Sequence, residues 1–117
     1  MNGTQTMAKI HELTTALLKA VEEEKFPLFP SLLEQRAHFV ESFVALPDEQ
    51  KGNKEVLSKM LGQIQELEKQ ILDCIQRNRE KYGLQGKKLQ KGEQAMKGGY
   101  MKLIEEMRSK RRFSGRG

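Results

Sequence analysis

Cysteine is almost absent from this chain, since Cys74 is the only one among 117 residues. One thiol cannot form an internal disulfide bond, so the fold is not a disulfide-stapled scaffold, and the sequence suits a reducing compartment. No run of 18 or more apolar residues occurs, and the first residues lack the charged start and apolar stretch of a secretory signal. We therefore expect a cytoplasmic protein that does not insert into a membrane.

Large side chains are also scarce, because there is no tryptophan and aromatic residues make up 6% of the chain. With 37% hydrophobic residues, the sequence supports the core of one small domain but not that of a large enzyme. Charge is unevenly placed: residues 1–80 carry 10 basic and 13 acidic side chains, whereas residues 81–117 carry 11 basic and 3 acidic ones. The basic end predicts contact with an acidic partner, with a nucleic acid or with the body of the chain itself.

Residue arrangements typical of enzymes are missing. His11, His38 and Cys74 lie far apart in the sequence and match no metal-ligand spacing. Cys74 falls in the apolar seam of a predicted helix, so we interpret it as a small buried residue rather than a nucleophile. The stretch 83–88 is not a phosphate-binding loop, because only two residues separate its glycines and no Ser or Thr follows its lysines. We expect neither catalysis nor a cofactor or metal.

Apolar residues recur at helical spacing in the first half of the chain. The first predicted helix covers about residues 4–25, with Thr4 or Thr6 as its N-cap. Pro27 and Pro30 interrupt it, and a second helix is predicted to begin near Pro30 and to stop before Pro47. Residues 47–53 have the composition of a loop. The two apolar stripes are Ile10, Leu13, Leu17 and Val21, and then Leu32, Leu33, Phe39, Val40, Phe43 and Leu46, with Arg36 on the second stripe.

The third predicted helix carries the strongest signal and follows Asn53, which suits an N-cap. Its seam alternates spacings of three and four over three heptads, as in a coiled coil. The seam residues are Leu57, Met60, Ile64, Leu67, Ile71, Cys74 and Asn78, and Leu61, Leu72 and Ile75 widen it. We therefore expect this helix to pack against more than one neighbour, and the same heptads could drive a homodimer.

Glycines beyond Tyr82 lower the helix propensity of the last third, each by about 1 kcal/mol relative to alanine. A short amphipathic helix is still predicted from about Glu93 to Lys110, and the basic tail of residues 111–117 is expected to be disordered. The prediction is an all-α fold, an antiparallel helical bundle of three to four helices with a long third helix and a mobile C-terminal helix, in one domain of residues 1–110. The last helix either completes the core or leaves a groove open for an incoming amphipathic helix, and periodicity favours neither.

Four segments of the chain form a recognisable set: IHELTTALLKAVEEE at residues 10–24, LLEQR at residues 32–36, the long heptad helix, and QAMKGGY at residues 94–100. Together they resemble the FliT family of flagellar export chaperones. The resemblance covers nearly the whole length, and Pro27, Pro30 and the basic tail depart from it. It implies a helical bundle that binds the C-terminal helical part of the filament-cap protein in the cytoplasm, prevents its premature assembly and delivers it to the flagellar type III export machinery, where it contacts the export ATPase complex.

The resemblance also implies that the last helix folds back over the substrate-binding groove. The late tyrosine of the family corresponds to Tyr100, and the arginine of its second helix corresponds to Arg36. A surface ion pair with a neighbouring glutamate is an equally good explanation of Arg36. Stripe geometry adds further groove or lid candidates, namely Ile71, Ile75, Tyr82, Met96 and Leu103.

Two other functions remain open at this point. Chaperones for the hook–filament junction proteins are also small helical bundles, so this chain could serve those substrates instead. A coiled-coil structural or nucleic-acid-associated protein would explain the heptads and the basic end. Specific nucleic-acid binding is not favoured, because Phe113 is the only aromatic residue in the basic tail and no known nucleic-acid module surrounds it.

Overall fold

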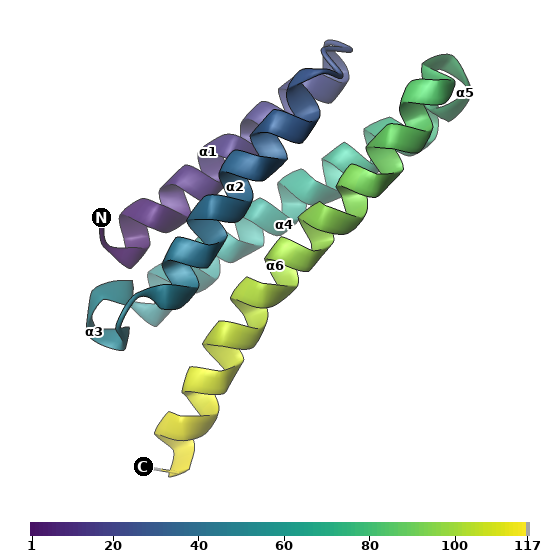
Figure 1. The fold of residues 1–117 in the computed structure, drawn as a ribbon. Coiled ribbons are helices and arrows are strands. Elements are labelled where there is room, and N and C mark those ends of the chain that lie inside the picture. Colours follow the sequence, from purple (N-terminus) through teal and green to yellow (C-terminus); the bar gives the residue numbers. More distant parts are fainter. Residues whose placement is uncertain (117) are drawn as a thin grey trace.

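The computed structural model describes the backbone of residues 1–116 and the side chains of residues 1–83 and 89–108. Within residues 1–116 four long helices form an antiparallel bundle, and no strand occurs (Figure 1). The long helices are α1 (Gly3–Glu22), α2 (Leu28–Ala45), α4 (Lys54–Arg77) and α6 (Leu84–Arg116), and the one-turn helices α3 (Asp48–Lys51) and α5 (Arg79–Tyr82) lie at opposite ends of the bundle. The all-α prediction is confirmed.

Helix α1 begins with a capping box, and its N-cap lies before both residues predicted for that position. Asn2 is the N-cap, because its side chain accepts a hydrogen bond from the Gln5 amide at 2.8 Å and its amide donates to Gln5 Oε1 at 2.9 Å. Thr6 donates its hydroxyl to the Asn2 carbonyl at 2.8 Å, so it lies inside the first turn. The prediction of Thr4 or Thr6 as N-cap is therefore wrong, since the reciprocal Asn2–Gln5 pair satisfies the terminal amides two residues earlier.

The connection from α1 to α2, residues 23–27, lies earlier in the sequence than predicted. Glu24 adopts a left-handed conformation with φ 57°, and the Lys25 amide donates to the Ala20 carbonyl at 2.8 Å, which is the pattern of a Schellman motif. Pro27 already has helical backbone angles as the N-cap of α2. Pro30 lies in the first turn, where its missing amide removes no intrahelical bond. The second helix therefore begins at Leu28, ahead of the predicted start at Pro30.

The segment between α2 and α4 was predicted as a loop but contains the single turn of α3. Gly52, with φ 108°, ends this turn. Asn53 then caps α4, as predicted, because its side chain accepts hydrogen bonds from the amides of Glu55 at 2.8 Å and Val56 at 3.3 Å. Gly52 allows the close approach of α1, since a Cβ there would lie 2.7 Å from Thr4 Oγ1.

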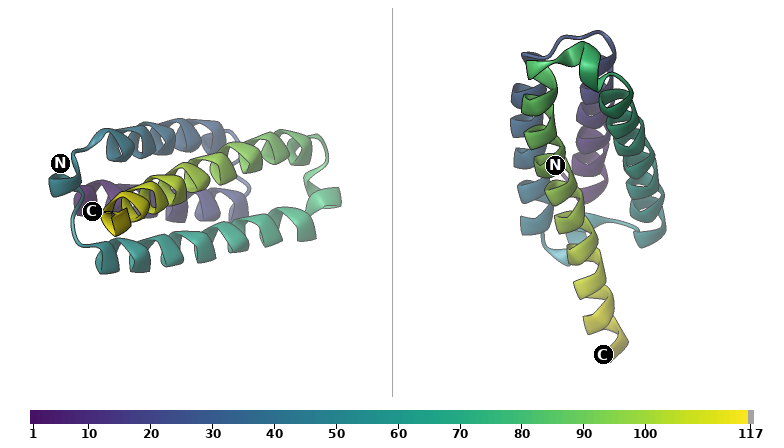
Figure 2. Two further views of the ribbon diagram at one scale, coloured as in Figure 1. Left: turned by 90° about the horizontal axis from the view of Figure 1, so that it is seen from below. Right: turned by 90° about the vertical axis from the view of Figure 1, so that its right-hand side faces the viewer.

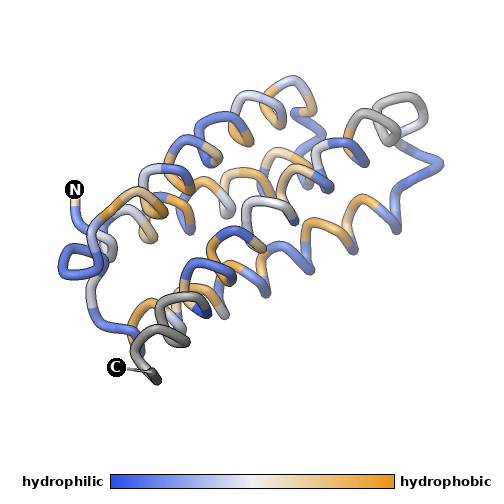
Figure 3. Tube along the Cα trace, turned by 60° about the horizontal axis from the view of Figure 1, so that its bottom comes forward, coloured by the Kyte–Doolittle hydropathy of each residue, from blue (hydrophilic) through white to orange (hydrophobic). Residues whose placement is uncertain are grey.

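The core consists of two clusters of buried side chains. Apolar residues recur along each long helix, as the hydropathy colouring in Figure 3 shows. The cluster near α5, called the tyrosine cluster here, contains Leu17, Val21, Phe29, Ile71, Cys74, Ile75, Tyr82, Leu89 and Met96. The cluster near α3, called the valine cluster, contains Met7, Ile10, Val40, Phe43, Leu57, Leu61, Ile64 and Leu103. Helix α4 contacts α1, α5 and α6, so the widened seam does meet several neighbours. Much of the predicted seam is buried inside the chain's own bundle, and the homodimer remains a prediction.

Helix α6 lies between α2 and α4 and extends past the end of the bundle that carries α3 (Figure 2). It supplies buried residues to both clusters and thus completes the core. It begins at Leu84, not near Glu93, so the predicted start is wrong. The helix extends to Arg116, past the predicted end at Lys110. The side chains from residue 109 on and the whole of residue 117, where a disordered tail is predicted, lie outside the described residues. Within the described part, no helix is both long and apolar enough to cross a bilayer.

Candidate functional site

Helix α6 packs directly against α2. Gly92 faces α2 so tightly that a Cβ at this position would lie 2.4 Å from Phe29 Cε1 and 2.9 Å from Leu33 Cδ1. Gly99, seven residues later and so on the same face, would place a Cβ 3.8 Å from Val40 Cγ2. Gly92 therefore does more than weaken the helix, because it lacks the side chain that would keep α6 away from α2, whereas a Cβ at Gly99 would make an ordinary van der Waals contact.

A buried arginine joins α6 to the two helices beneath it. Arg36 on α2 is 2% exposed, and its Nη2 donates to Glu68 Oε2 on α4. Its Nη1 donates to the Met96 carbonyl on α6 at 3.1 Å. One guanidinium thus connects three helices by charge-assisted hydrogen bonds. The alternative of a surface ion pair for Arg36 is wrong in its location, because the glutamate that it meets lies 32 residues away and is itself buried.

Burial dominates the electrostatics of this pair. Loss of hydration raises the pKa of the Glu68 carboxyl to about 7, although the nearby Arg36 and Lys97 charges act in the opposite direction. The same loss of hydration lowers the pKa of Arg36. Arg36 Nε has no hydrogen-bond partner among the described atoms, so the guanidinium is not fully satisfied by the closed bundle.

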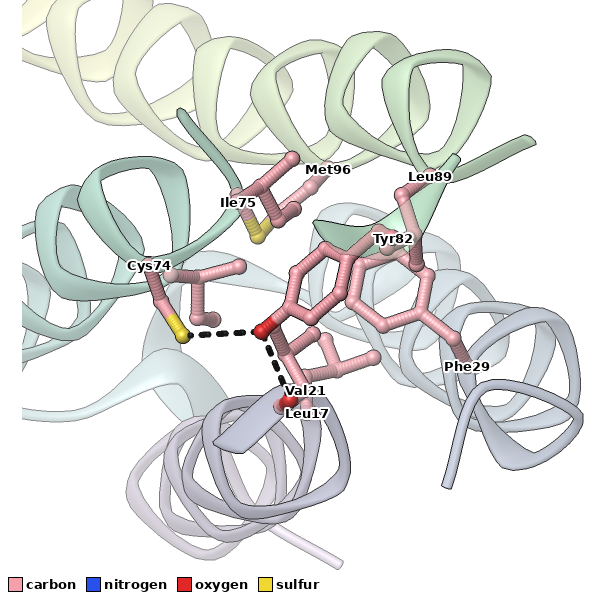
Figure 4. Packing of buried hydrophobic residues seen from close by; sticks show 9 residues of the cluster. Leu17, Val21, Phe29, Cys74, Ile75, Tyr82, Leu89 and Met96 are labelled. Atoms are coloured by element: carbon pink, nitrogen blue, oxygen red, sulfur yellow. Dashed lines mark hydrogen bonds between the residues drawn. The ribbon is translucent and has the colours of Figure 1, made fainter. Parts of the chain in front are cut away.

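Tyr82 packs and hydrogen-bonds within the tyrosine cluster at the α5 end of the molecule, as Figure 4 shows. Its hydroxyl donates to the Val21 carbonyl at 3.2 Å and lies 3.5 Å from Cys74 Sγ. Its ring meets the edge of Phe26 with a centroid distance of 4.7 Å. Burial raises the pKa of the Tyr82 hydroxyl, with a smaller contribution from Cys74. Cys74 is buried as predicted and contributes to packing.

The predicted site residues are gathered around α6, but most of them are buried. Four of them, Ile71, Ile75, Tyr82 and Met96, share the tyrosine cluster. Leu103 belongs to the valine cluster, and the half-buried Tyr100 packs against it. Arg36 meets this set of residues at the Met96 carbonyl. These residues form the covered interface between α6 and the other helices, and none of them lies on a freely exposed surface while α6 is docked.

Sequence reasoning missed Glu68, although its position carried a signal. The buried positions of α4 run Leu57, Leu61, Ile64, Glu68, Ile71 and Ile75, with alternating spacings of four and three. Glu68 is the single acid on this stripe, just as Arg36 is the single cation on the stripe of α2. A lone acid and a lone base at core positions of two helices predict a buried pair.

Lys51 forms a second polar junction at the α3 end. Its Nζ lies 3.3 Å from Glu106 on α6 and 3.8 Å from Asp48, and it donates to the Leu46 carbonyl. The ammonium also lies 5.8 Å from the centre of the Phe43 ring. This junction holds the last described turns of α6 against α3.

Most of the chain matches a known protein family. Residues 4–101 match the model of one protein family, described as flagellar protein FliT. Searches of curated proteins and of solved structures found no significant match. The matched range includes α1 to α5 and α6 as far as Met101, and it therefore contains Arg36, Glu68 and both glycines that face α2. The chain belongs to the FliT family of flagellar export chaperones.

Proposed function

We propose that this chaperone binds the C-terminal helical segment of the filament-cap protein in the cytoplasm, prevents its premature assembly and delivers it to the export apparatus and its ATPase complex. The observation that carries this proposal is the way α6 is docked. It completes the core through a stripe of large apolar residues, its Met96 carbonyl accepts a hydrogen bond from Arg36, and Gly92 lets it lie close to α2. An incoming amphipathic helix could occupy the same interface.

The stripe on α6 defines what such a helix needs. Leu89, Met96 and Leu103 are buried at seven-residue spacing, and small residues lie between them on the side of α2. In our proposal Arg36, Ile71, Ile75 and Tyr82 form the groove, whereas Met96, Tyr100 and Leu103 belong to the lid, which is the part of α6 that covers it. A substrate helix with large apolar residues every seven positions would replace the lid side chains one for one.

The exchange is favoured by the composition of α6. Gly92, Gly98 and Gly99 each cost about 1 kcal/mol relative to alanine when the segment is helical. The described side chains of Leu89, Met96 and Leu103 are its fully buried apolar anchors, whereas α4 buries a longer stripe. Opening of α6 alone therefore costs less than unfolding of the whole bundle.

Two cysteines can test whether the lid must move. A Cβ at residue 99 would lie 3.8 Å from Val40 Cγ2, so the Val40→Cys/Gly99→Cys variant places a thiol of α2 next to a thiol of α6 for oxidation to a disulfide. We expect the oxidised variant to bind purified filament-cap protein at least about tenfold more weakly than the reduced variant, because a fixed lid blocks the groove. Isothermal titration calorimetry measures both states of the same protein, so reduction is the matched control.

Equal affinity before and after oxidation would refute the lid. A chain that binds hook–filament junction proteins in the same assay, but not the filament-cap protein, would instead be a chaperone for those substrates. The buried seam of α4 gives a homodimeric coiled coil no additional support, since its residues already pack within the chain.

A further inference from the structure

A groove between the beginning of α4 and the later turns of α6 is not used by the function proposed above. It contains two adjoining cavities of about 170 Å³ and about 120 Å³, which share Lys54 and Met107. The larger cavity is lined by Lys54, Ser58, Leu61, Ile104, Met107 and Arg108. Because α6 provides one wall, this groove exists only while α6 is docked, and it is distinct from the interface that α6 covers.

The floor of the groove is apolar. Leu61 is buried at its base, and Ile104 and Met107 are half-buried in its wall. Met101, three residues before Ile104 and so on the same face of α6, is 48% exposed. Methionine adapts its shape to different partners, which suits a binding surface. The groove therefore offers apolar surface that no described part of the chain covers.

The rim of the groove is basic. Lys54 and Arg108 are both exposed, and neither forms an ion pair with any side chain that the structure describes. In the smaller cavity, Asp48 and Glu106 are already engaged by Lys51, at 3.8 Å and 3.3 Å. Among the charged residues that line the two cavities, Lys54 and Arg108 are thus the ones without a described ion-pair partner, and both are positive.

We propose that this groove docks an amphipathic helix of a partner protein, whose apolar side chains enter the two cavities and whose flanking acidic residues meet Lys54 and Arg108. The basic tail of the chain is not the occupant, because it has the same sign of charge as the rim and α6 continues as a helix to Arg116. The phosphates of a nucleic acid would pair with the basic residues of the rim, but a nucleic acid has no apolar side chain to fill the floor of the groove. Complementary charge together with an apolar centre is the usual composition of a helix-in-groove contact.

Two labelled synthetic peptides of about 18 residues test this proposal by fluorescence anisotropy with the full chain. One has leucines at helical spacing and glutamates on both flanks, and the other is a scrambled version of the same composition. We expect the patterned peptide to bind more tightly than the scrambled one. The Lys54→Glu/Arg108→Glu variant should weaken binding at least about tenfold, because it reverses both rim charges.

Matched variants separate this surface from general charge effects. Lys59→Glu changes an exposed lysine on another face of α4 and should leave the affinity unchanged. Ser58→Phe places a ring at the exposed lining of the larger cavity and should abolish binding of the patterned peptide while the circular dichroism spectrum stays helical.

Three results would overturn the proposal. The first is that the scrambled peptide binds as tightly as the patterned one. The second is that the Lys54→Glu/Arg108→Glu variant binds the patterned peptide with unchanged affinity, and the third is that the Ser58→Phe variant still binds it. If single-stranded RNA bound more tightly than the patterned peptide and lost affinity in the charge-reversed variant, the rim would be a nucleic-acid surface instead. The peptide assay contains no filament-cap protein, and the calorimetric assay contains no synthetic peptide. Either proposal can therefore fail while the other stands.

Discussion

At the scale of single residues, the Arg36–Glu68 pair presents a thermodynamic contrast. Both side chains are almost completely removed from water, and the loss of hydration opposes the attraction between their charges. A pair of this kind adds little net stability compared with apolar residues of similar size, yet removal of one member leaves the other charge buried and alone. The pair therefore specifies which helices meet more than it strengthens their contact.

This contrast predicts the order of two variants. Arg36→Ala should lower the free energy of unfolding by about 3–5 kcal/mol, because Glu68 and the Met96 carbonyl lose their buried donor. Arg36→Met/Glu68→Leu should be close to the parent chain, since no buried charge remains. Guanidinium denaturation followed by circular dichroism measures both values. A double variant as unstable as the single one would show that the pair itself contributes most of the stability.

The raised pKa of Glu68 predicts a pH dependence. Folding raises this pKa from the usual value of a glutamate to about 7, so between about pH 4.5 and 7 the native state holds a proton that the unfolded state has released. The contribution of Glu68 to stability is therefore complete below this window and is lost as the pH rises through it, by at most about 1.4 kcal/mol per pH unit.

Glu68→Gln removes this titration. We expect the stability of the parent chain to fall relative to that of Glu68→Gln between pH 5 and pH 8, as measured by urea denaturation at several pH values. Parallel curves for the two proteins would mean that Glu68 is ionised throughout this range. The variant keeps an oxygen that can accept the bond from Arg36, so the loss of packing is small.

At the scale of helices, the glycines of α6 have different surroundings. A methyl group at Gly92 would meet Phe29 and Leu33 at less than 3.0 Å, whereas nothing lies within 4 Å of a methyl group at Gly98. Both alanine substitutions gain the same helix propensity, about 1 kcal/mol. Gly92→Ala should therefore be less stable than Gly98→Ala by about 1–3 kcal/mol, the usual cost of overpacking.

Thermal denaturation of the two alanine variants checks this order directly. Gly98→Ala should unfold at a higher temperature than the parent chain, because it strengthens an exposed part of the helix without touching a neighbour. If both variants were stabilised equally, α6 would not lie against α2 as closely as described. The pair is well matched, since the two sites are six residues apart on one helix.

Helix boundaries illustrate which local features the sequence analysis could resolve. The cap of α4 at Asn53 was predictable, because a capping residue directly precedes a long apolar stripe. The start of α6 was not predictable, because glycines lower helix propensity when a helix is considered alone. The reason for a glycine at position 92 becomes clear only from its close approach to Phe29. The cap of α1 at Asn2 needed the partner Gln5 to be considered together with it.

At the scale of the whole molecule, the division of charge is visible in the contacts between helices. Lys102 on α6 lies 2.6 Å from Glu41 on α2, and Lys81 beside α6 lies 3.3 Å from Glu24 at the end of α1. The basic third of the chain thus partly neutralises the acidic body, which was one of the three partners considered from the sequence. These exposed pairs are individually weak, and salt screens them.

Hydrogen exchange should reveal a difference in stability between the helices. We expect amides of residues 89–101 on α6 to exchange faster than those of residues 60–75 on α4, because α6 contains the glycines and has fewer buried anchors. Mass spectrometry of the exchanged chain measures this, and 0.5 M salt should widen the difference by weakening the ion pairs. Equal protection of the two helices would mean that the bundle opens only as one unit.

The fold was largely predictable, and the candidate site only in part. Helical periodicity identified all four long helices, because each presents an apolar stripe to a common core. The residues proposed for the groove also came together around α6. What periodicity could not give is long-range pairing: the meeting of Arg36 with Glu68 and Met96, and of Tyr82 with Val21, depends on how the helices are packed.

The hydrogen bond of Tyr82 also has an optical consequence. The chain has no tryptophan and two tyrosines, so its intrinsic emission comes from Tyr82 and Tyr100 alone. The Tyr82 hydroxyl is engaged by a carbonyl and lies beside a thiol, an environment that quenches tyrosine emission, whereas Tyr100 is half-buried on α6. In a Tyr82→Phe variant the emission would report on Tyr100 only, so the helix carries its own spectroscopic probe and its release from the bundle can be followed without an added dye.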